Sequence, residues 1–394
     1  MEMLSYIYSI TRKVIFVKRA EGVFMIYFDN AATGGFKPRT VSDTANNVIR
    51  YLSANPGRSG HRLSVSGVEM IYNCRKLIGD FFNANSERVI FTKNCTEALN
   101  IAIFGTLKKG GHVITTVFEH NSVLRPLHYL KSLNLISLDV VEPTSDTPIE
   151  LAIKRKINDK TYLIVTTAVS NVTGKTLPID KIGKIAKNHN LIYLVDGAQG
   201  GGHISINLER DNISILCLAG HKGLLGIMGS GVLLFNEKTE ISPLIMGGTG
   251  SESHNLFQPD CYPERLEAGT LNLPAICALY EGVRIIRDNL ENYANHLYFY
   301  TERLISGLND HKIKCYSLPN KSGIVSFKLD DMPSDDVADL LNSRYDIAVR
   351  GGFHCAPLMH RFLKTQESGL VRVSFSVQNT SREIDYLLNV LESL

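Results

Sequence analysis

A lysine and an aspartate follow two apolar runs of the sequence at the points where the runs end. Lys222 comes just after Ile213–Leu218 and is surrounded by glycines and apolar residues. Partial removal from water lowers the pKa of a lysine and makes its amine available for a Schiff base. Asp196 closes the run Leu191–Val195. Taken singly, Lys222 could be an ordinary loop lysine and Asp196 a turn or helix-capping residue.

As a pair, the two residues predict a binding site for pyridoxal phosphate. Ligands of open parallel sheets bind at the carboxyl ends of the strands, where Asp196 and Lys222 are both expected. A carboxylate keeps the pyridine nitrogen of this cofactor protonated so that its ring can accept electrons, and a lysine carries its aldehyde. The order and context of the two residues favour this interpretation over an ordinary loop lysine and a separate turn or helix-capping aspartate.

A third segment offers a place for the phosphate of such a cofactor. Thr92–Asn100 follows an apolar run and opens a helical pattern, and free N–H groups in the first turn of a helix bind anions. Asn94 or Thr96 could instead serve only as the helix cap. His120 also follows a strand end, where an imidazole could lie flat on the cofactor ring and move protons near neutral pH. A surface or core histidine is the alternative.

One cysteine stands in an unusual setting. Cys355 lies between His354 and an Ala-Pro turn, with Arg350 five residues upstream. Cationic neighbours favour the thiolate, which is the reactive form of cysteine, whereas a structural cysteine normally lies within an apolar run, as Cys217 does. Metal ligation by Cys355 with His354 or His360 would need further ligands, and none is spaced to complete a tetrahedral set. We therefore interpret Cys355 as a nucleophile.

The elements that must position these residues alternate along the chain as far as about Glu240. Several apolar runs are apolar at consecutive positions, which is typical of strands buried on both faces, and helical patterns lie between them. This alternation predicts an α/β domain with a mostly parallel sheet covered by helices on both sides. The expected strands are Val89–Thr92, His112–Thr116, Leu135–Val140, Tyr162–Thr166, Leu191–Val195, Ile213–Leu218 and Gly231–Phe235, and the expected helices include Thr96–Phe104, Ser122–Leu133 and Ile179–Asn188.

We expect residues 25–274 to form this large domain, its first residues packing with the small domain, and residues 275–394 to form a smaller α+β domain. A loop-rich section, 246–274, separates the two patterns. Residues 1–24 mix basic and apolar residues; we expect an extension or an over-long start, with a targeting segment as the alternative. In the small domain we expect helices Ala275–Leu308, Ser334–Arg344 and Ser381–Leu391, and strands Gly323–Leu329, Asp346–Val349 and Val371–Val377.

The composition argues against several classes of protein. Lys and Arg total 42 against 39 Asp and Glu, a net charge of +3, which gives no electrostatic footprint for nucleic acid or an anionic membrane. No apolar run approaches the roughly 20 residues of a membrane-spanning helix. The seven cysteines are scattered without a C-x-x-C pair, so neither a disulfide framework nor a metal site is expected. We expect a soluble protein of a reducing cytoplasm.

In addition, the chain resembles the cysteine desulfurase and selenocysteine lyase group of the class V aminotransferase superfamily, which has fold type I. The resemblance runs from about Met25 to the C-terminus. The matching segments, in order, are Tyr27–Thr33, Arg58–Ser64, the stretch around Thr96, Glu119–Asn121, Ser170–Gly174, Asp196–Gln199, Gly220–Lys222, Gly247–Gly250, Glu267–Thr270, Arg350–Pro357, Val371–Ser374 and Asn379–Thr380.

This resemblance implies a seven-stranded sheet in the large domain, a homodimer with its site completed across the interface, and a role for each site residue. Lys222 would carry the cofactor, Asp196 would pair with its pyridine nitrogen, Gln199 would bond its ring hydroxyl and His120 would stack on its ring. Cys95, Thr96 and His221 would hold the phosphate with Thr249 of the second subunit. Asn171 and Arg372 would bind the substrate carboxylate, Ala32 would contact the substrate, and Cys355 would accept sulfur.

The reaction implied is removal of sulfur from L-cysteine, giving L-alanine and a persulfide on Cys355 for transfer to an acceptor protein. A selenocysteine lyase, another class V aminotransferase or epimerase, and a sulfur-delivery scaffold without turnover are the alternatives. A transaminase has no need of Cys355. Three positions depart from the usual pattern of the family: Ala219 replaces a hydroxyl residue, Cys95 replaces a smaller or hydroxyl residue, and Gln378 replaces an aromatic residue.

Overall fold

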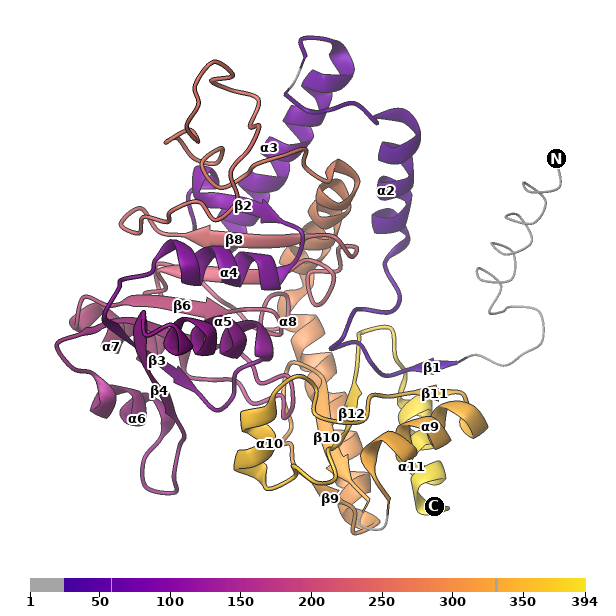
Figure 1. The fold of residues 1–394 in the computed structure, drawn as a ribbon. Helices are drawn as coiled ribbons and strands as arrows, with labels where there is room; N and C mark the ends of the chain where they lie inside the picture. The colour runs from indigo at the N-terminus through magenta and orange to yellow at the C-terminus, as the bar shows by residue number, and fades with distance from the viewer. Residues whose placement is uncertain (1–24, 58, 330–331) are drawn as a thin grey trace.

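Seven strands form the central sheet because their apolar side chains can be buried on both faces (Figure 1). The computed structural model describes residues 25–57, 59–329 and 332–394, so the expectations for residues 1–24 lie outside the described part. The strands are β2 (Val89–Thr92), β3 (Gly111–Thr116), β4 (Ile136–Val141), β5 (Thr161–Thr167), β6 (Ile192–Asp196), β7 (Ile215–Ala219) and β8 (Gly231–Phe235).

The sheet has the order β2-β8-β7-β6-β5-β3-β4. Strand β8 is antiparallel to both of its neighbours, β7 and β2, and every other neighbouring pair is parallel. The predicted seven-stranded, mostly parallel sheet is therefore confirmed. Consecutive residues of one strand enter opposite cores: Leu194 packs in the core on one face, and Val195 packs in the core on the other.

Helices cover both faces of this sheet. The α4 and α5 helices supply apolar residues to one core, while α3, α6, α7 and the first half of α8 supply the other. In Figure 1, α4 and α5 lie in front of the strands. The helices are α2 (Arg39–Tyr51), α3 (Arg62–Phe82), the short 3-10 helix η1 (Ser86–Arg88), α4 (Cys95–Gly105), α5 (Asn121–Ser132), α6 (Ile149–Lys156), α7 (Ile179–Asn188), α8 (Leu273–Asp310), α9 (Ser334–Tyr345), α10 (Pro357–Leu363) and α11 (Ser381–Glu392).

A separate core, the C-terminal core, forms around a small antiparallel sheet near the C-terminus. Strands β9 (Lys314–Cys315), β10 (Ile324–Lys328) and β12 (Val371–Ser374) lie in the order β12-β10-β9, and α9 and α11 pack with them. Strand β1 (Ile26–Tyr27) pairs in parallel with β11 (Ile347–Ala348), and Phe28 is fully buried in the same core. The first described residues thus pack with the C-terminal part of the chain.

The long helix α8 packs with both the large sheet and the C-terminal core. Leu273 and Ile276 near its start pack with the large sheet, whereas Leu304 and Leu308 near its end pack with the small one. The side chain of Asn272 caps the helix by accepting the N–H of Ala275 at 3.3 Å. The division of the chain between residues 274 and 275 stays a prediction.

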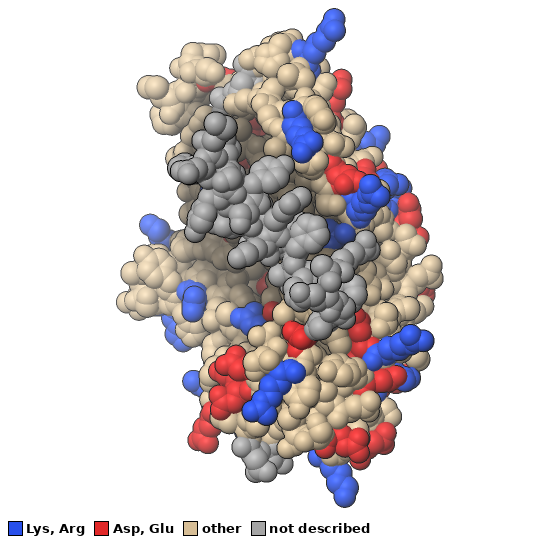
Figure 2. Space-filling view, turned by 90° about the vertical axis from the view of Figure 1, so that its right-hand side faces the viewer, with Lys and Arg blue, Asp and Glu red and all other residues tan. Residues whose placement is uncertain are grey.

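On the face shown in Figure 2, basic and acidic side chains are interspersed. This distribution agrees with the small net charge of the sequence. Among the described residues, no helix is long and apolar enough to cross a membrane.

Candidate active site

The carboxyl ends of β3, β5, β6 and β7, together with the segment after β2, surround one cavity with about 510 Å³ of open space. Parallel strands direct these ends to the same edge of a sheet, which is where open α/β sheets bind ligands. Eight of the predicted site residues line this cavity: Cys95, Thr96, His120, Asn171, Asp196, Gln199, His221 and Lys222.

Lys222 lies in the turn that follows β7. Burial lowers the pKa of its amine, and the neighbouring Asp196 and Cys95 act in the opposite direction. The guanidinium groups of Arg372 and Arg350 contribute further to the lowering. An amine with a lowered pKa is a better nucleophile and proton acceptor near neutral pH.

Asp196 presents one carboxylate oxygen to the protein and leaves the other to a ligand. Its Oδ1 accepts the backbone N–H of Ala198 at 2.9 Å and the thiol of Cys95 at 3.5 Å. Among the described contacts both bonds fall on Oδ1, so Oδ2 is the oxygen left for a ligand. Burial raises the pKa of Cys95 well above its usual value, which keeps the thiol protonated as a donor. The Cys95 side chain therefore faces Asp196, and only its backbone remains for the expected phosphate contact.

The first turns of α4 and α5 meet at the end of the cavity predicted to bind phosphate. Asn94 caps α4, since its side chain accepts the N–H of Glu97 at 2.9 Å. The hydroxyls of Thr96 and Ser122 lie 2.8 Å apart and join the two helices. His221 Nδ1 lies 3.0 Å from the Thr33 hydroxyl. Free backbone donors at a helix N-terminus suit an anion.

His120 caps α5 with its ring nitrogen Nδ1 and carries its single proton on Nε2. Its Nδ1 accepts the backbone N–H of Ser122 at 3.0 Å, which puts the proton of the neutral ring on Nε2. Burial lowers the pKa of His120 to about 4. Proton shuttling near neutral pH would require a pKa close to 7, so this imidazole is better suited to donate a hydrogen bond from Nε2 while staying neutral.

Two side-chain oxygens on the cavity wall lack partners among the described atoms. Gln199 donates from Nε2 to the carbonyl of Ala31 at 2.8 Å, and its Oε1 is buried without a partner. Asn171 donates to the carbonyl of His354 at 2.7 Å, and its Oδ1 is also unpartnered. Buried polar atoms are nearly always hydrogen-bonded. These two atoms, with Asp196 Oδ2, therefore fit a polar ligand such as pyridoxal phosphate.

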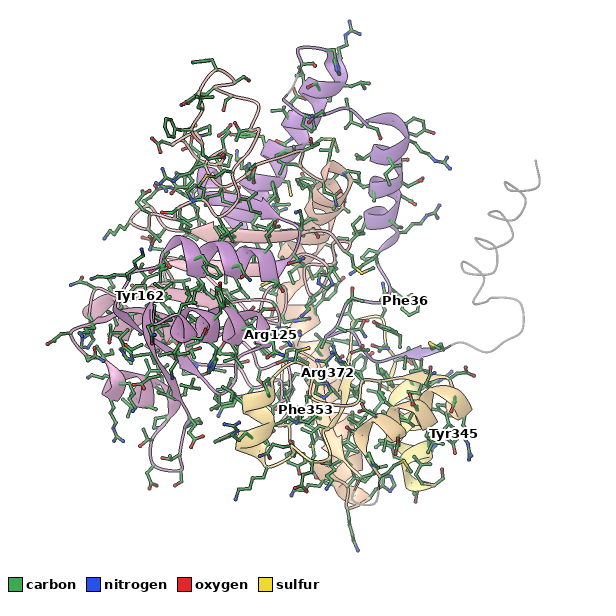
Figure 3. The ribbon with its side chains drawn as sticks, in the orientation of Figure 1. Phe36, Arg125, Tyr162, Tyr345, Phe353 and Arg372 are labelled. Carbon is green, nitrogen blue, oxygen red and sulfur yellow. The ribbon has the colours of Figure 1, made fainter. Side chains whose placement is uncertain are left out.

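Cys355 and Arg372 lie beside the cavity and not among its lining residues. Arg372 is 1% exposed, and its guanidinium donates to the carbonyl of Asn171 at 3.1 Å and pairs with Asp29 at 2.8 Å. Figure 3 shows Arg372 at the level where the large sheet and the C-terminal part meet.

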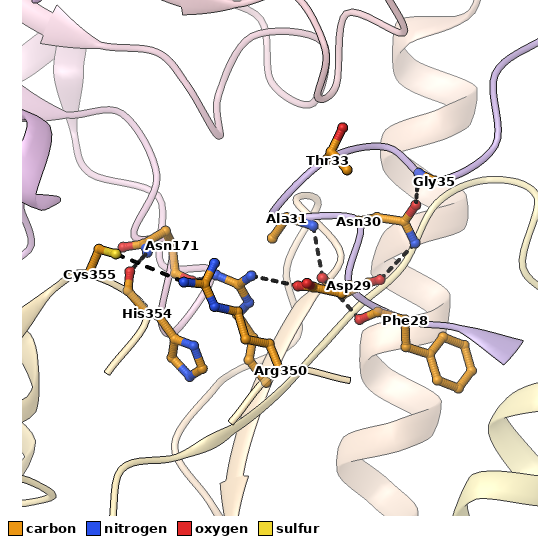
Figure 4. A network of polar contacts seen from close by, with 12 residues as sticks. Phe28, Asp29, Asn30, Ala31, Thr33, Gly35, Asn171, Arg350, His354 and Cys355 are labelled. Atoms are coloured by element: carbon orange, nitrogen blue, oxygen red, sulfur yellow. Dashed lines mark hydrogen bonds and ion pairs between the residues drawn. The ribbon is translucent and has the colours of Figure 1, made fainter. Parts of the chain in front are cut away.

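The Cys355 loop is anchored beside the start of α5. The carbonyl of Cys355 accepts the N–H of Asn121 at 2.8 Å, and Asn171 holds the preceding carbonyl, of His354 (Figure 4). His354 and Cys355 both have positive φ angles, 49° and 57°, which non-glycine residues rarely adopt. Arg350 Nη2 lies 3.9 Å from Cys355 Sγ. The backbone therefore holds the thiol next to the cavity.

Two predicted site residues lie elsewhere. Ala32 is in the turn after β1, next to the Ala31 carbonyl that Gln199 binds, and it is not among the cavity-lining residues. Thr249 lies in the long loop between β8 and α8, where its hydroxyl donates to the carbonyl of Ser251 at 3.3 Å. Its predicted role requires a second subunit, so it stays a prediction.

Sequence reasoning gave no role to two acids that the structure puts at the site. Asp29 pairs with Arg372, and Glu119 is fully buried beside Asp196. The hydroxyl of Thr116 donates to Glu119 at 2.6 Å, and burial raises the pKa of this carboxyl to about 8. A charged residue directly after the apolar pair Val117 and Phe118 was the available signal for Glu119.

Fold and site together define a fold-type I enzyme. The chain belongs to the aminotransferase class-V family, which it matches over residues 26–387. A probable cysteine desulfurase of Pyrococcus abyssi is 34% identical over 388 residues, with 94% of each chain covered. One of Methanothermobacter thermautotrophicus is 31% identical, again with 94% coverage of each. The apo structure of a cysteine desulfurase from Thermococcus onnurineus NA1 superimposes with a TM-score of 0.87 at 32% identity, covering 94% of both chains. The family generally depends on pyridoxal phosphate.

Proposed function

We propose that this chain is a cysteine desulfurase, which binds pyridoxal phosphate, removes sulfur from L-cysteine and keeps it as a persulfide on Cys355. The observation that carries the proposal is the combination of Lys222 and Asp196 on one cavity with an anchored cysteine loop beside it. The names of the relatives from Pyrococcus abyssi and Methanothermobacter thermautotrophicus support the same reaction.

The cavity residues would hold the cofactor by complementary polar groups. Lys222 would bind its aldehyde, Asp196 its pyridine nitrogen and Gln199 its ring hydroxyl, while the start of α4 would take its phosphate. When bound, pyridoxal phosphate supplies an aldehyde that captures the substrate amine and a ring that accepts electrons from the substrate carbon.

The protein's own groups would bind the amino acid and move its protons. Arg372, with Asn171 beside it, is suited to the substrate carboxylate because a guanidinium can bind both carboxylate oxygens. Burial of Lys222 favours its neutral amine, which can accept the proton from the substrate α-carbon. His120 holds a proton at Nε2 and can donate a hydrogen bond from it to the substrate sulfur or to the cofactor side of the site while its ring stays neutral.

Cys355 would carry out the sulfur transfer. Its thiolate forms a bond to the substrate sulfur while the bond between that sulfur and the β-carbon breaks, and the electron pair of the broken bond stays on the carbon fragment. The carbon fragment takes up a proton and leaves as alanine, and the sulfur stays on Cys355 as a persulfide. A thiol of an acceptor protein would then remove this sulfur. The chemistry requires a reduced Cys355, which suits a cytoplasmic location.

A second copy of the chain is expected to complete the site. The loop between β8 and α8, which carries Thr249, exposes Met246 (70%), Leu256 (97%) and Phe257 (83%). Large apolar side chains grouped on a surface loop are typical of an interaction surface. We propose that a homodimer covers them and brings Thr249 toward the phosphate of the partner's cofactor.

The first prediction tests the reaction itself. Protein loaded with pyridoxal phosphate should be trapped by borohydride as an adduct on Lys222, and incubation with L-cysteine should yield alanine and a persulfide that mass spectrometry maps to Cys355. Cys355→Ala should keep the adduct and lose at least about a hundredfold in alanine production, because the sulfur acceptor is gone. Cys261→Ala, at an exposed cysteine, is the matched control. Release of alanine and sulfide at full rate from Cys355→Ala would refute the proposal.

A further inference from the structure

Residues 26–37, which we call the N-terminal arm, connect the C-terminal core to the lysine turn. At one end, β1 pairs with β11, and the Asn30 side chain donates to the carbonyl of Ser374 at 2.9 Å. At the other end, the N–H of Gly34 and the amine of Lys37 both donate to the carbonyl of His221, at 3.0 and 2.7 Å. The arm thus contacts Arg372 through Asp29 and the lysine turn through the carbonyl of His221.

Asp29 lies in the middle of this arm and forms an ion pair with Arg372. Its Oδ1 is 2.8 Å from Arg372 Nη2, and its side chain is 22% exposed. Arg372 Nη1 donates to the carbonyl of Asn171, and its Nε has no partner among the described atoms. A guanidinium has five N–H donors in one plane. Asp29 and Asn171 take two of them, so enough donors remain for a second carboxylate.

The backbone of the arm holds the Asp29 carboxylate in place. The N–H of Phe28 donates to the carbonyl of Ala348 at 2.8 Å, and the N–H of Ala32 donates to the carbonyl of Asp29 at 3.1 Å. These bonds fix the backbone on both sides of Asp29, so its carboxylate approaches Arg372 from one side.

The charge of the buried Arg372 is a further reason for its pairing with Asp29. Burial disfavours the charged form of Arg372, and Asp29 counteracts this effect. Arg350 adds a like charge nearby. A buried arginine without a counter-charge is costly, and its side chain would turn away from the site or draw in solvent.

We infer that Asp29 is a positioning residue that fixes the guanidinium of Arg372 for the substrate carboxylate, an inference that rests on the proposed function. Asp29 holds the Nη2 edge of the guanidinium and keeps it charged, so that its remaining donors face an arriving carboxylate in one orientation. Asp29 therefore strengthens binding of amino-acid substrates specifically through their carboxylate group, and does not compete with them for the arginine.

The test compares two ligands that differ only in the carboxylate. L-cysteine and cysteamine both react through their amine, but only L-cysteine has a carboxylate. Binding is measured from the absorbance change of the cofactor-loaded protein, for wild type, Asp29→Asn, Asp29→Glu and the control Asp43→Asn. Asp43 pairs with Arg39 on the exposed face of α2, away from the cavity.

We expect Asp29→Asn to weaken L-cysteine binding by roughly tenfold to a hundredfold, the effect of losing one charged hydrogen-bond partner, and to leave cysteamine binding unchanged. Asp29→Glu should recover part of the loss because it restores the charge, and Asp43→Asn should bind both ligands as wild type does. An Asp29→Asn variant that binds L-cysteine more tightly would show that the two carboxylates compete. Equal weakening of both ligands would show a merely structural role. Either result overturns the inference.

Variants of Arg372 separate this inference from the proposed function. Arg372→Met should weaken L-cysteine binding by itself, and adding Asp29→Asn to it should cause no further loss, because residues that act through one another are not additive. The double variant also leaves no Asp29 carboxylate without its partner, which removes that cost of the single variant. Unchanged L-cysteine binding in Arg372→Met would contradict the assignment of Arg372 under the proposed function. Weakening in Arg372→Met with full binding in Asp29→Asn would contradict only the role of Asp29.

Discussion

Burial controls the protonation of the side chains around the cavity. It lowers the pKa of Lys222 and His120, and it raises the pKa of Cys95 and Glu119. All four shifts favour the uncharged form, as expected when a group loses contact with water. The site therefore combines groups whose uncharged form is favoured with the ion pair of Asp29 and Arg372. This separation of neutral and charged groups suits a substrate that carries both an amine and a carboxylate.

Glu119 makes the stability of the fold depend on pH. Its folded pKa is about 8, against 4.5 in the unfolded chain, so the folded state binds one more proton between these values. Stability must therefore fall as the pH rises through this window. Relative to Glu119→Gln, which cannot ionise, wild type should lose about 1.4 kcal/mol of unfolding free energy per pH unit between pH 5 and 8.

Urea unfolding of both proteins at several pH values measures this difference. Glu87→Gln, at an exposed position in η1, is the matched control. A difference between wild type and Glu119→Gln that stays constant across the window would show that Glu119 titrates normally in the folded protein.

At the scale of elements, a buried ion pair fixes the loop that leads into α8. Arg75 on α3 donates to both carboxylate oxygens of Glu267, at 2.9 and 2.5 Å, and the N–H of Phe91 donates to the same carboxylate. Both side chains of the pair are less than 10% exposed. The pair therefore joins α3, β2 and the long loop at one buried point.

Removal of Arg75 should be costly because it leaves Glu267 buried without a counter-charge. We expect Arg75→Ala to lower the unfolding free energy by about 3–5 kcal/mol. Arg39→Ala, which breaks the exposed pair with Asp43 on α2, should cost no more than about 0.5 kcal/mol. Equilibrium unfolding in urea gives both values, and similar small losses in the two variants would contradict the predicted importance of burial.

Elements with strong local patterns could be predicted from the sequence. Val89–Thr92 and Gly231–Phe235 agree with β2 and β8 at both ends, and Ile179–Asn188 agrees with α7. Strand β12 ends at Ser374, three residues before the expected end at Val377. The backbone there leaves the small sheet, and the Ser374 carbonyl accepts hydrogen bonds from Asn30. Strand β1 is only two residues long and depends on a partner more than 300 positions away, so no local pattern could reveal it.

Local sequence patterns could likewise predict only part of the candidate site. Strand ends and their polar residues predicted the position of Lys222, Asp196 and His120, because a parallel sheet brings such ends together. The ion pair between Asp29 and Arg372 joins residues 343 positions apart, and neither has a neighbour in sequence that indicates the other. The hydrogen bond from Asn121 to the Cys355 carbonyl is similar. Such contacts follow from how the small core docks and not from any repeating pattern.

At the scale of the whole molecule, the proposed dimer depends on the exposed loop between β8 and α8. Leu256→Asp combined with Phe257→Asp should weaken the dimer at least about a hundredfold, since each large apolar side chain buried contributes about 1.5–3 kcal/mol. Sedimentation velocity measures the dissociation, and cofactor retention should fall with it if Thr249 serves the partner's phosphate.

Leu318→Asp is the matched control, because Leu318 is 81% exposed in the connection between β9 and β10. This variant should sediment as wild type does. A wild-type protein that stays monomeric while fully active would contradict the proposed dimer.

Helix α8 also fixes the angular relation between the large sheet and the C-terminal core. Its 38 residues form one continuous rod of roughly 57 Å, and each residue turns the rod by about 100°. A single residue inserted between Ile286 and Leu297 would rotate the C-terminal core about this axis relative to the large sheet. Every helix and strand could then remain intact while Cys355 no longer faced the cavity that contains Lys222. The rotational register of helix α8 is thus as necessary to the site as the residues that line the cavity.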